Sequence, residues 1–275
     1  AAIFIPNCDY LSGLVFYAMG PAIGALYMTA FGLMAAHLLP PVWAKAAVVI
    51  WLLVTAGWNL LHFYTSPQIF AYNPILGFYS GTIYDEVIEI STAYLSFRLA
   101  TLSQIFLFVL IAYAKRCTPS STLLKLSIVA LALTQCVFFA YRGRLGIEVS
   151  ATDIENALGG RHESDHFVIF YPENDFSERH VQRLSEDHEF RYYQLEKLLG
   201  VAPATKIRSY IYTDPAQKRA LMGADKTYIA KPWQGAVHLH KLEYGAPVLK
   251  HELAHVFGAE INKDFLAIPT TAVVI

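Results

Sequence analysis

Charged side chains are scarce in the first half of this 275-residue chain. Residues 1–141 carry nine of them, five basic and four acidic, whereas residues 142–275 carry thirty-four. With 55% hydrophobic residues, the chain is too apolar for a disordered protein. Its net charge of −1 and the lack of clustered Lys and Arg exclude a nucleic-acid partner. The split in charge predicts two parts that fold in two different solvents.

Cysteine is also scarce. The three cysteines are far apart in the sequence and form no CxxC pair, so neither a disulfide framework nor a thiolate zinc site is predicted; they are Cys8, Cys117 and Cys136. The sequence begins with Ala1 and ends at Ile275 inside an apolar run. We therefore expect a processed chain or a fragment.

The first half contains four apolar stretches that approach or exceed the roughly 20 residues that a helix needs to cross a bilayer. They predict an all-α transmembrane domain over residues 1–141, with spans at about 14–39, 46–64, 93–114 and 123–141. A buried core helix could explain one such stretch, but not four stretches in a segment with nine charges. The chain is therefore expected to be an integral multi-pass membrane protein with the lipid bilayer as a partner.

Details of these spans predict their local features. Gly20-Pro21 is expected to break the first span, and Arg98 is expected to snorkel from the start of the third. His37 and His62 are expected to lie at the membrane interface rather than to bind a ligand. Positive charges favour cytoplasmic loops, so the loop 65–92 and everything after the last span are predicted to be extracytoplasmic. That loop is predicted as an interfacial loop, with a substrate approach or a docking surface as alternatives.

The second half has the pattern of an α+β domain with a small mixed sheet. Residues 142–165 are polar and predict a linker or irregular segment. The following segments alternate between strand and helix patterns, with Gly200 as the end of the first helix and Asp214-Pro215 as the start of the second. The expected order is strand 166–171, helix 177–199, strand 206–212, a short helix to about 223, strand 236–241 and helix 246–259.

The last helix contains an HExxH motif, His251-Glu252-Leu253-Ala254-His255. Residues four apart lie on one helix face, so the two imidazoles can bind one Zn²⁺ while Glu252 lies beside its open position. Zinc acidifies its bound water, and a carboxylate at Glu252 can take the proton as general base. The motif predicts hydrolysis of peptide bonds.

On these residues the second half resembles the zincin metallopeptidases, specifically the gluzincin (thermolysin-like, peptidase MA) group. The resemblance covers about residues 166–260, and the domain itself is expected to span 166–275. It implies that His251 and His255 are zinc ligands, that Glu252 is the general base and that peptides or proteins are the substrates. It also implies a third ligand, a Glu about twenty residues beyond the second His.

No acidic residue follows Asp264, so the third ligand must come from elsewhere. We expect it just past Ile275 in a longer chain. Asp264 is a weak alternative, after a helix break at Gly258, while Glu260 is predicted to lie on the opposite side of the helix. A degenerate domain without catalysis is the remaining possibility.

The other histidines carry weaker predictions. His238 and His240 share one face of their strand, so they are candidate substrate-binding residues that could reach the cleft. The remaining histidines of this half have no ligand spacing and are expected at the surface; they are His162, His166, His180 and His188.

The sequence thus favours a membrane-anchored zinc peptidase, with an inactive zincin-like binding or sensor module as the alternative. An intramembrane protease is disfavoured because charged residues such as Lys250 and Lys263 flank the motif. No intramembrane charge cluster indicates a transporter.

Overall fold

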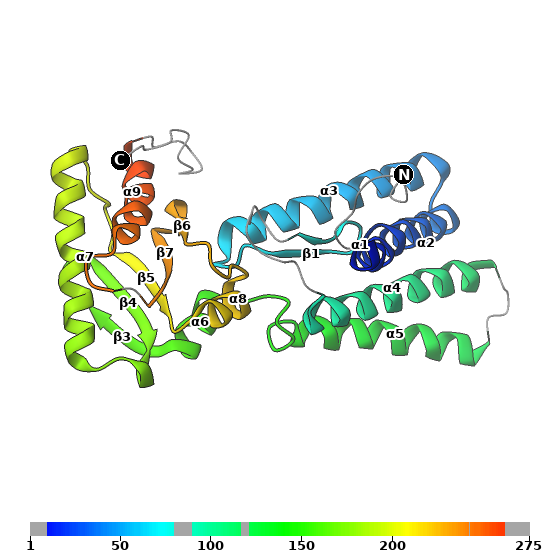
Figure 1. Cartoon of the computed structure of the whole chain (residues 1–275). Coiled ribbons are helices and arrows are strands. Elements are labelled where there is room, and N and C mark those ends of the chain that lie inside the picture. The colour runs from blue at the N-terminus through cyan, green and yellow to red at the C-terminus, as the bar shows by residue number, and fades with distance from the viewer. Residues whose placement is uncertain (1–9, 80–89, 117–120, 242, 262–275) are drawn as a thin grey trace. The chain divides into compact units, whose positions relative to one another are not determined.

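The computed structural model describes residues 10–79, 90–116, 121–241 and 243–261 (Figure 1). Contacts divide the described chain into two compact units. The helical unit comprises residues 10–63, 70–79 and 90–148. The sheet unit comprises residues 64–69, 149–241 and 243–261. Each unit has its own interior and is described separately.

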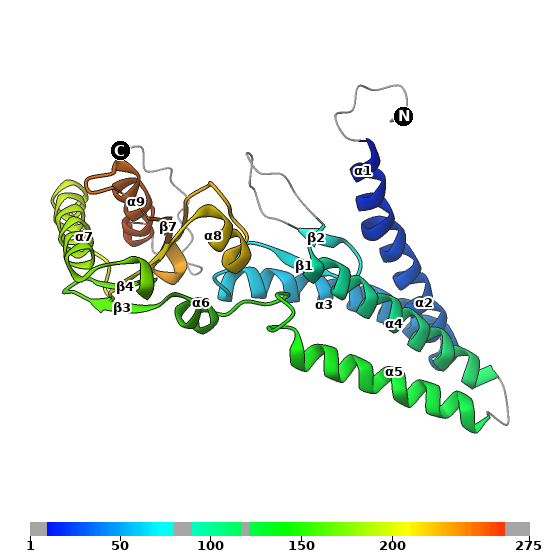
Figure 2. The same cartoon turned by 60° about the horizontal axis from the view of Figure 1, so that its bottom comes forward.

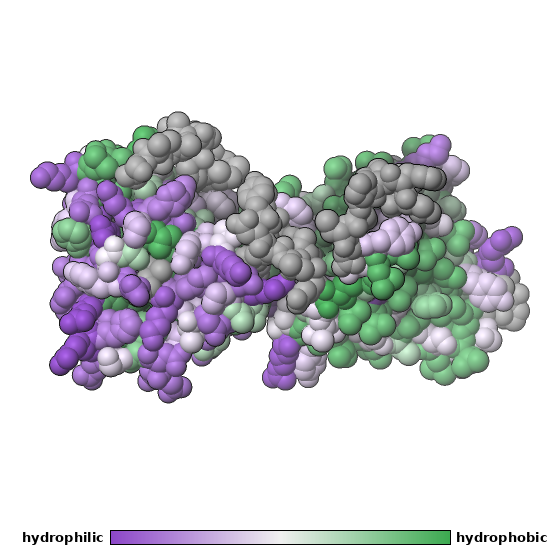
Figure 3. All heavy atoms as spheres, in the orientation of Figure 1, coloured by the Kyte–Doolittle hydropathy of each residue, from purple (hydrophilic) through white to green (hydrophobic). Residues whose placement is uncertain are grey.

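The helical unit contains the apolar helices expected from the sequence. Its elements are α1 (Tyr10–Tyr17), η1 (Ala18–Ala22), α2 (Ile23–Leu38), α3 (Pro41–Thr65), β1 (Ala71–Asn73), β2 (Gly77–Tyr79), α4 (Thr92–Arg116) and α5 (Thr122–Tyr141). Four segments among the described residues are long and apolar enough to cross a membrane: Tyr10–Leu38, α3, α4 and α5. The prediction of four apolar helices is confirmed. In Figure 3 their surface is largely hydrophobic, as the lipid-facing side of membrane helices must be.

The first apolar segment is one continuous helical path with an irregular turn. At η1 the helix widens around Pro21, which has no backbone N–H to donate. The expected break at Gly20-Pro21 is therefore a local π-type turn, and the helix continues into α2.

The loop 65–92 contains a two-stranded antiparallel hairpin, β1 and β2, that packs into the helical unit. Asn73 is buried; its side-chain oxygen accepts the backbone N–H groups of Ile75 and Leu76, and its amide donates to the carbonyl of Thr55 in α3. The backbone of Ile75 lies so close to Gly24 that no β-carbon fits between them. The hairpin is thus an internal part of this unit, in contrast to a simple interfacial loop.

Arg98 differs from its prediction. Its side chain is only 2% exposed and does not snorkel to the end of α4. Its guanidinium donates to the carbonyls of Pro74, at 3.1 Å, and Gly20, at 3.4 Å, and to the hydroxyl of Tyr94. Because Pro74 of the hairpin and Gly20 of η1 supply carbonyl acceptors inside the unit, the charge is satisfied there and need not reach water.

The sheet unit is built on five strands in the order β3-β4-β5-β7-β6. Its elements are α6 (Ala151–Leu158), β3 (Gly159–Glu163), β4 (Phe167–Pro172), η2 (Glu173–Asp175), α7 (Glu178–Leu199), β5 (Ile207–Tyr212), α8 (Pro215–Met222), β6 (Ile229–Lys231), η3 (Pro232–Gln234), β7 (Ala236–His240) and α9 (Pro247–Ile261). Strands β4, β5 and β7 are parallel, while β3 and β6 run antiparallel at the two edges. The predicted small mixed sheet is confirmed.

The two faces of this sheet carry different helices. Alternate residues such as Ile211, Val237 and Leu239 pack with α7 and α9 in one apolar core. The residues between them face α6 and α8, and Tyr210 donates to Glu155 of α6. Figure 2 shows α7 and α9 on the side of the sheet opposite to α6. The core fixes α9, the helix with the HExxH motif, against both the sheet and α7.

Two segments of the sheet unit differ from the sequence prediction. Residues 142–165 were expected as a linker, but they contain α6, which Ser150 and Asp153 start with a capping box, and the edge strand β3. The second segment is residues 64–69, which lie far away in the sequence. Gln68 is fully buried, and its side-chain oxygen accepts the backbone N–H of Val149 at 2.6 Å.

Candidate metal site

The HExxH helix is fixed at its start by α7. The loop before it has Gly245 at a positive φ of 83°, and Asp187 of α7 accepts the backbone N–H of this glycine at 3.0 Å. Arg191, one turn along α7, donates to the Gly245 carbonyl at 3.0 Å. Pro247 then begins α9, where its missing N–H costs nothing. These contacts set where the motif begins.

His251 and His255 lie on one face of α9 with their ring nitrogens close together. The Nε2 atoms are 3.2 Å apart, and the rings are nearly perpendicular at 88°. Two nitrogens bound to one tetrahedral zinc at about 2.0–2.1 Å would be separated by about 3.3 Å. His251 is exposed and His255 is half-buried, with a pKa lowered by burial and by the neighbouring His251. The pair therefore has the spacing of two ligands to one metal ion.

Glu252 points away from solvent, toward the edge strand of the sheet. It is 6% exposed, and its carboxylate accepts a hydrogen bond from the backbone of Ala230 in β6. Burial raises the pKa of Glu252 to about 7, although the positive charge of Lys218 and the Ala230 hydrogen bond act in the opposite direction. A carboxyl with this pKa can both hold and release a proton near neutral pH.

A third ligand for the histidine pair is not found among the residues that the structure describes. Within them, no group of three or more His, Cys, Asp or Glu side chains could hold a metal ion. Asp264 and all residues after Ile261 lie outside the described part. Glu260 lies near enough to Tyr192 of α7 to raise the pKa of that tyrosine, after the larger contributions of burial, Glu196, Glu189 and Tyr193. Two of the three ligands expected from the sequence are thus brought together.

His238 lies on the face of the sheet opposite to α9. It is fully buried, stacks on Tyr210 and shares a hydrogen bond of 2.9 Å between its Nδ1 and the hydroxyl of Tyr212. His240 is on the same face and pairs its Nε2 with the carbonyl of Asp225 at 2.6 Å. Val237 and Leu239, between and beside them, are the residues that face α9. The structure does not bring either histidine to the HExxH face.

Two of the histidines expected at the surface are structural. His188 is buried, with ring nitrogens 2.8 Å from the Leu184 carbonyl and 2.9 Å from the Ser209 hydroxyl; burial lowers its pKa to about 4. His166 is 2.7 Å from Glu189 and stacks on Tyr192. Both belong to the contact between α7 and the sheet.

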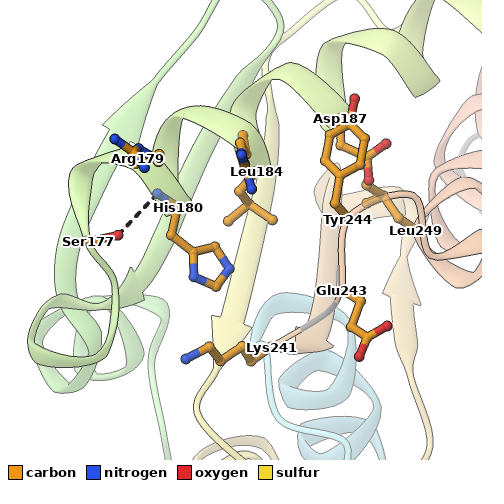
Figure 4. A pocket seen from close by; sticks show the side chains of 10 residues that line it. Ser177, Arg179, His180, Leu184, Asp187, Lys241, Glu243, Tyr244 and Leu249 are labelled. Atoms are coloured by element: carbon orange, nitrogen blue, oxygen red, sulfur yellow. Dashed lines mark hydrogen bonds between the residues drawn. The ribbon is translucent and has the colours of Figure 1, made fainter.

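A concave pocket of about 600 Å³ lies where α7 begins (Figure 4). Four basic side chains line it, and leucines form part of its wall: Arg179, His180, Arg183, Lys241, Leu184 and Leu249. In Figure 4, His180 and Lys241 lie on one side of the pocket and Asp187 and Tyr244 on the other. Burial lowers the pKa of His180, and the charges of Lys241 and Arg183 lower it further. The pocket follows the carboxyl ends of β4 and β7, where ligands of α/β sheets bind.

Comparison with known proteins finds no matching family model, no matching curated protein and no matching solved structure. The function must therefore be argued from the site itself. The sequence analysis missed the edge strand β6, although Thr227-Tyr228-Ile229 has the β-branched and aromatic character of a strand. It also missed Asp187 and Arg191, because no local pattern indicates which helix face meets the loop before α9.

Proposed function

We propose that this protein is a membrane-anchored zinc-dependent peptidase that resembles the gluzincins. One observation carries the proposal: the Nε2 atoms of His251 and His255 are 3.2 Å apart on a helix whose intervening Glu252 is buried beside them. The same distance also fits a hydrogen bond between the two rings, so the spacing supports the proposal together with the HExxH sequence and not by itself. The membrane part rests on the four helices that are long and apolar enough to span a bilayer.

In the proposed reaction, His251 and His255 hold the metal together with a third ligand outside the described residues. Zinc there would supply Lewis acidity toward the scissile carbonyl and toward a bound water. Glu252 would take the proton of the attacking water and deliver it to the leaving amine. The edge strand β6 lies beside Glu252 and offers a place for an extended peptide to add a further strand.

The decisive test compares two carboxamide variants of the same helix in the full chain. Glu252→Gln should keep its zinc and lose at least a hundredfold in metal-dependent peptide cleavage, because only the proton acceptor is removed. Glu260→Gln, on the same helix, is the matched control and should cleave normally. Zinc content by elemental analysis and cleavage of a peptide library measure both properties. Unchanged cleavage by Glu252→Gln would refute the proposal.

The alternative is a zincin-like module that binds in the membrane without catalysis. It is favoured by the absence of a third ligand among the described residues and by the hydrogen bond that already occupies Glu252. Zinc analysis separates the two functions. A peptidase should bind about one zinc per full chain and lose it in His251→Ala or His255→Ala, whereas a degenerate module should bind none.

We also propose that the sheet unit lies on the extracytoplasmic side, from the positive charges of Lys45 near the start of α3, Lys115 and Arg116 at the end of α4 and Lys125 near the start of α5. A single cysteine introduced at Glu243, an exposed position in the sheet unit, should react with a membrane-impermeant maleimide in intact cells. Cys8, Cys117 and Cys136 would be replaced by serine beforehand. Labelling only after cell lysis would place the unit in the cytoplasm.

A further inference from the structure

The helical unit contains a cavity of about 670 Å³ that the proposed peptidase reaction does not use. One face each of α3, α4 and α5 forms its walls, and the β1 strand closes part of it. Trp58 and Phe139, which line it, are 51% and 61% exposed, so the cavity opens to the surroundings of the helices. If these helices span a bilayer, those surroundings are lipid.

The walls of this cavity are mostly apolar but not entirely so. Aromatic side chains supply much of the lining: Trp51, Trp58, Phe97, Phe138 and Phe139. Three carboxamides also line it. Gln135 of α5 donates to the Ala100 carbonyl, whereas the described residues offer no hydrogen-bond partner to Asn59 of α3 or Gln104 of α4. An amide without a hydrogen-bond partner has an unfavourable free energy in hydrocarbon. A ligand that fits this cavity should therefore have polar atoms as well as an apolar body.

The polar end of the cavity carries no net charge. Arg142 and Glu148 line it together and form an ion pair in which the Arg142 Nε and the Glu148 Oε2 are 2.5 Å apart. Arg142 also lies over the ring of Phe139, at 3.8 Å from the ring centroid. Because this guanidinium already has its counter-charge, an anionic head group is not required of the ligand.

The volume of the cavity indicates which occupant fits it, a lipid or a transmembrane helix of a partner protein. A transmembrane α-helix is about 10–12 Å across with its side chains, so even 15 Å of it would fill more than about 1,000 Å³. The cavity is smaller than that, and it lies within the roughly 300–1,000 Å³ of small-ligand sites. Its dimensions fit a lipid chain with its linkage region better than a segment of a partner protein.

We propose that this cavity is a binding site for one membrane glycerolipid. Its ester or hydroxyl oxygens accept hydrogen bonds from the amides of Asn59 and Gln104, and an acyl chain lies against the aromatic wall. The site depends on the helical unit being in a membrane, but it does not depend on the peptidase activity.

Native mass spectrometry of the full chain in mild detergent tests the site, with dioleoylphosphatidylethanolamine as the added lipid. We expect one saturable adduct per chain, in which Asn59→Leu/Gln104→Leu weakens binding at least tenfold, since leucine keeps the volume but not the hydrogen bonds. Cys136→Trp should also weaken it, because Cys136 lines the cavity and is exposed, so a larger ring can occupy the space. Thr134→Val is the matched control on α5; Thr134 donates to the Ala130 carbonyl and does not line the cavity.

Equal binding by the wild type and both cavity variants would overturn the proposal, as would the absence of any saturable adduct or a co-purifying hydrophobic peptide in place of lipid. Circular dichroism and size-exclusion chromatography establish that each variant is folded. If the double variant does not fold, Cys136→Trp decides the outcome. Zinc content and peptide cleavage by the same preparations show separately whether the proposed peptidase function stands.

Discussion

Many leucine side chains are exposed in the helical unit, whereas leucines form part of the buried core in the sheet unit. In the helical unit, Leu60 and Leu99 are 72% and 68% exposed, whereas in the sheet unit Leu195 and Leu253 are completely buried. The first arrangement is favoured in an apolar surrounding, and the second is the ordinary core of a protein in water. The contrast fits the four helices that are long and apolar enough to span a membrane.

The interiors differ as a consequence. Helices in a membrane lack a hydrophobic force between them, and the helical unit has the contacts expected in that case: close backbone approach at small residues and hydrogen bonds to carbonyls. Gly24 touches the backbone of Ile75, and Arg98 bonds the carbonyls of Gly20 and Pro74. The sheet unit instead packs large side chains against one another, such as Phe257 against Tyr192. The helical unit should therefore be the more sensitive of the two to added volume at glycine.

The largest effect is expected from Gly24→Ala in α2. A β-carbon there would overlap the Ile75 carbonyl, and a backbone atom cannot move aside as a side chain can. We expect a loss of about 3 kcal/mol or more, seen as a lower melting temperature in detergent by circular dichroism. Gly32→Ala is the matched control on the same helix; its β-carbon would meet only Val48 at 3.9 Å. This control should be neutral or gain up to about 1 kcal/mol.

The corresponding change in the sheet unit is Gly160→Ala in β3. Its β-carbon would come within 2.5 Å of the ring of Tyr171, a half-buried side chain that can rotate away. A cost of about 1 kcal/mol is expected, well below that of Gly24→Ala. Equal losses for the two variants would contradict the distinction between backbone and side-chain packing.

The next prediction is that acid lowers the stability of the sheet unit more than that of the helical unit. His188 has a pKa of about 4 in the folded sheet unit, against 6.5 for a free histidine, because its burial disfavours the charged form. Between these values the unfolded chain binds a proton that the folded one does not, so stability falls as pH falls from 6.5 to 4. The full loss is about 3 kcal/mol. His238, whose pKa is also lowered by burial, acts in the same direction.

Hydrogen exchange followed by mass spectrometry measures the acid response of each unit, peptide by peptide. On acidification, and after correction for the intrinsic exchange rate, peptides of α7 and β5 should lose protection while those of α2 and α4 keep it. His188→Gln, which can still bond Ser209 but does not titrate near neutral pH, should reduce the pH dependence. Equal loss of protection in both units would show that a different set of groups controls the acid response.

The sequence predicted features that depend on local pattern and missed those that depend on which surfaces meet. The four apolar helices, the capped ends of α7 and α8 at Gly200 and Asp214, and the pairing of His251 with His255 on one face all follow from spacing. Burial of Arg98 and His188 does not, because each also depends on partners far away in the sequence: Pro74 and Gly20 for Arg98, and Ser209 for His188. The third metal ligand stays a prediction, since it falls outside the described residues.

The smallest effect concerns the segment 64–69. No local sequence pattern indicates that this segment belongs to the sheet unit. The Tyr64 carbonyl accepts from both the Trp233 Nε1, at 2.8 Å, and the Gln234 Nε2, at 2.7 Å. Gln234 also donates to the Ser66 carbonyl, which Lys231 reaches as well. Each acceptor thus has two donors.

Because one donor remains after a single change, Trp233→Phe or Gln234→Leu alone should cost no more than about 1 kcal/mol. The double variant leaves the Tyr64 carbonyl without either donor and should cost more than the sum of the two. Hydrogen exchange of residues 64–69 and thermal unfolding measure this coupling. Gln182→Leu, which removes only a surface hydrogen bond to Glu186, is the control and should change neither. Strict additivity would mean that the two donors hold the segment independently, and that residues 64–69 join the sheet unit mainly through Lys231 and the buried Gln68.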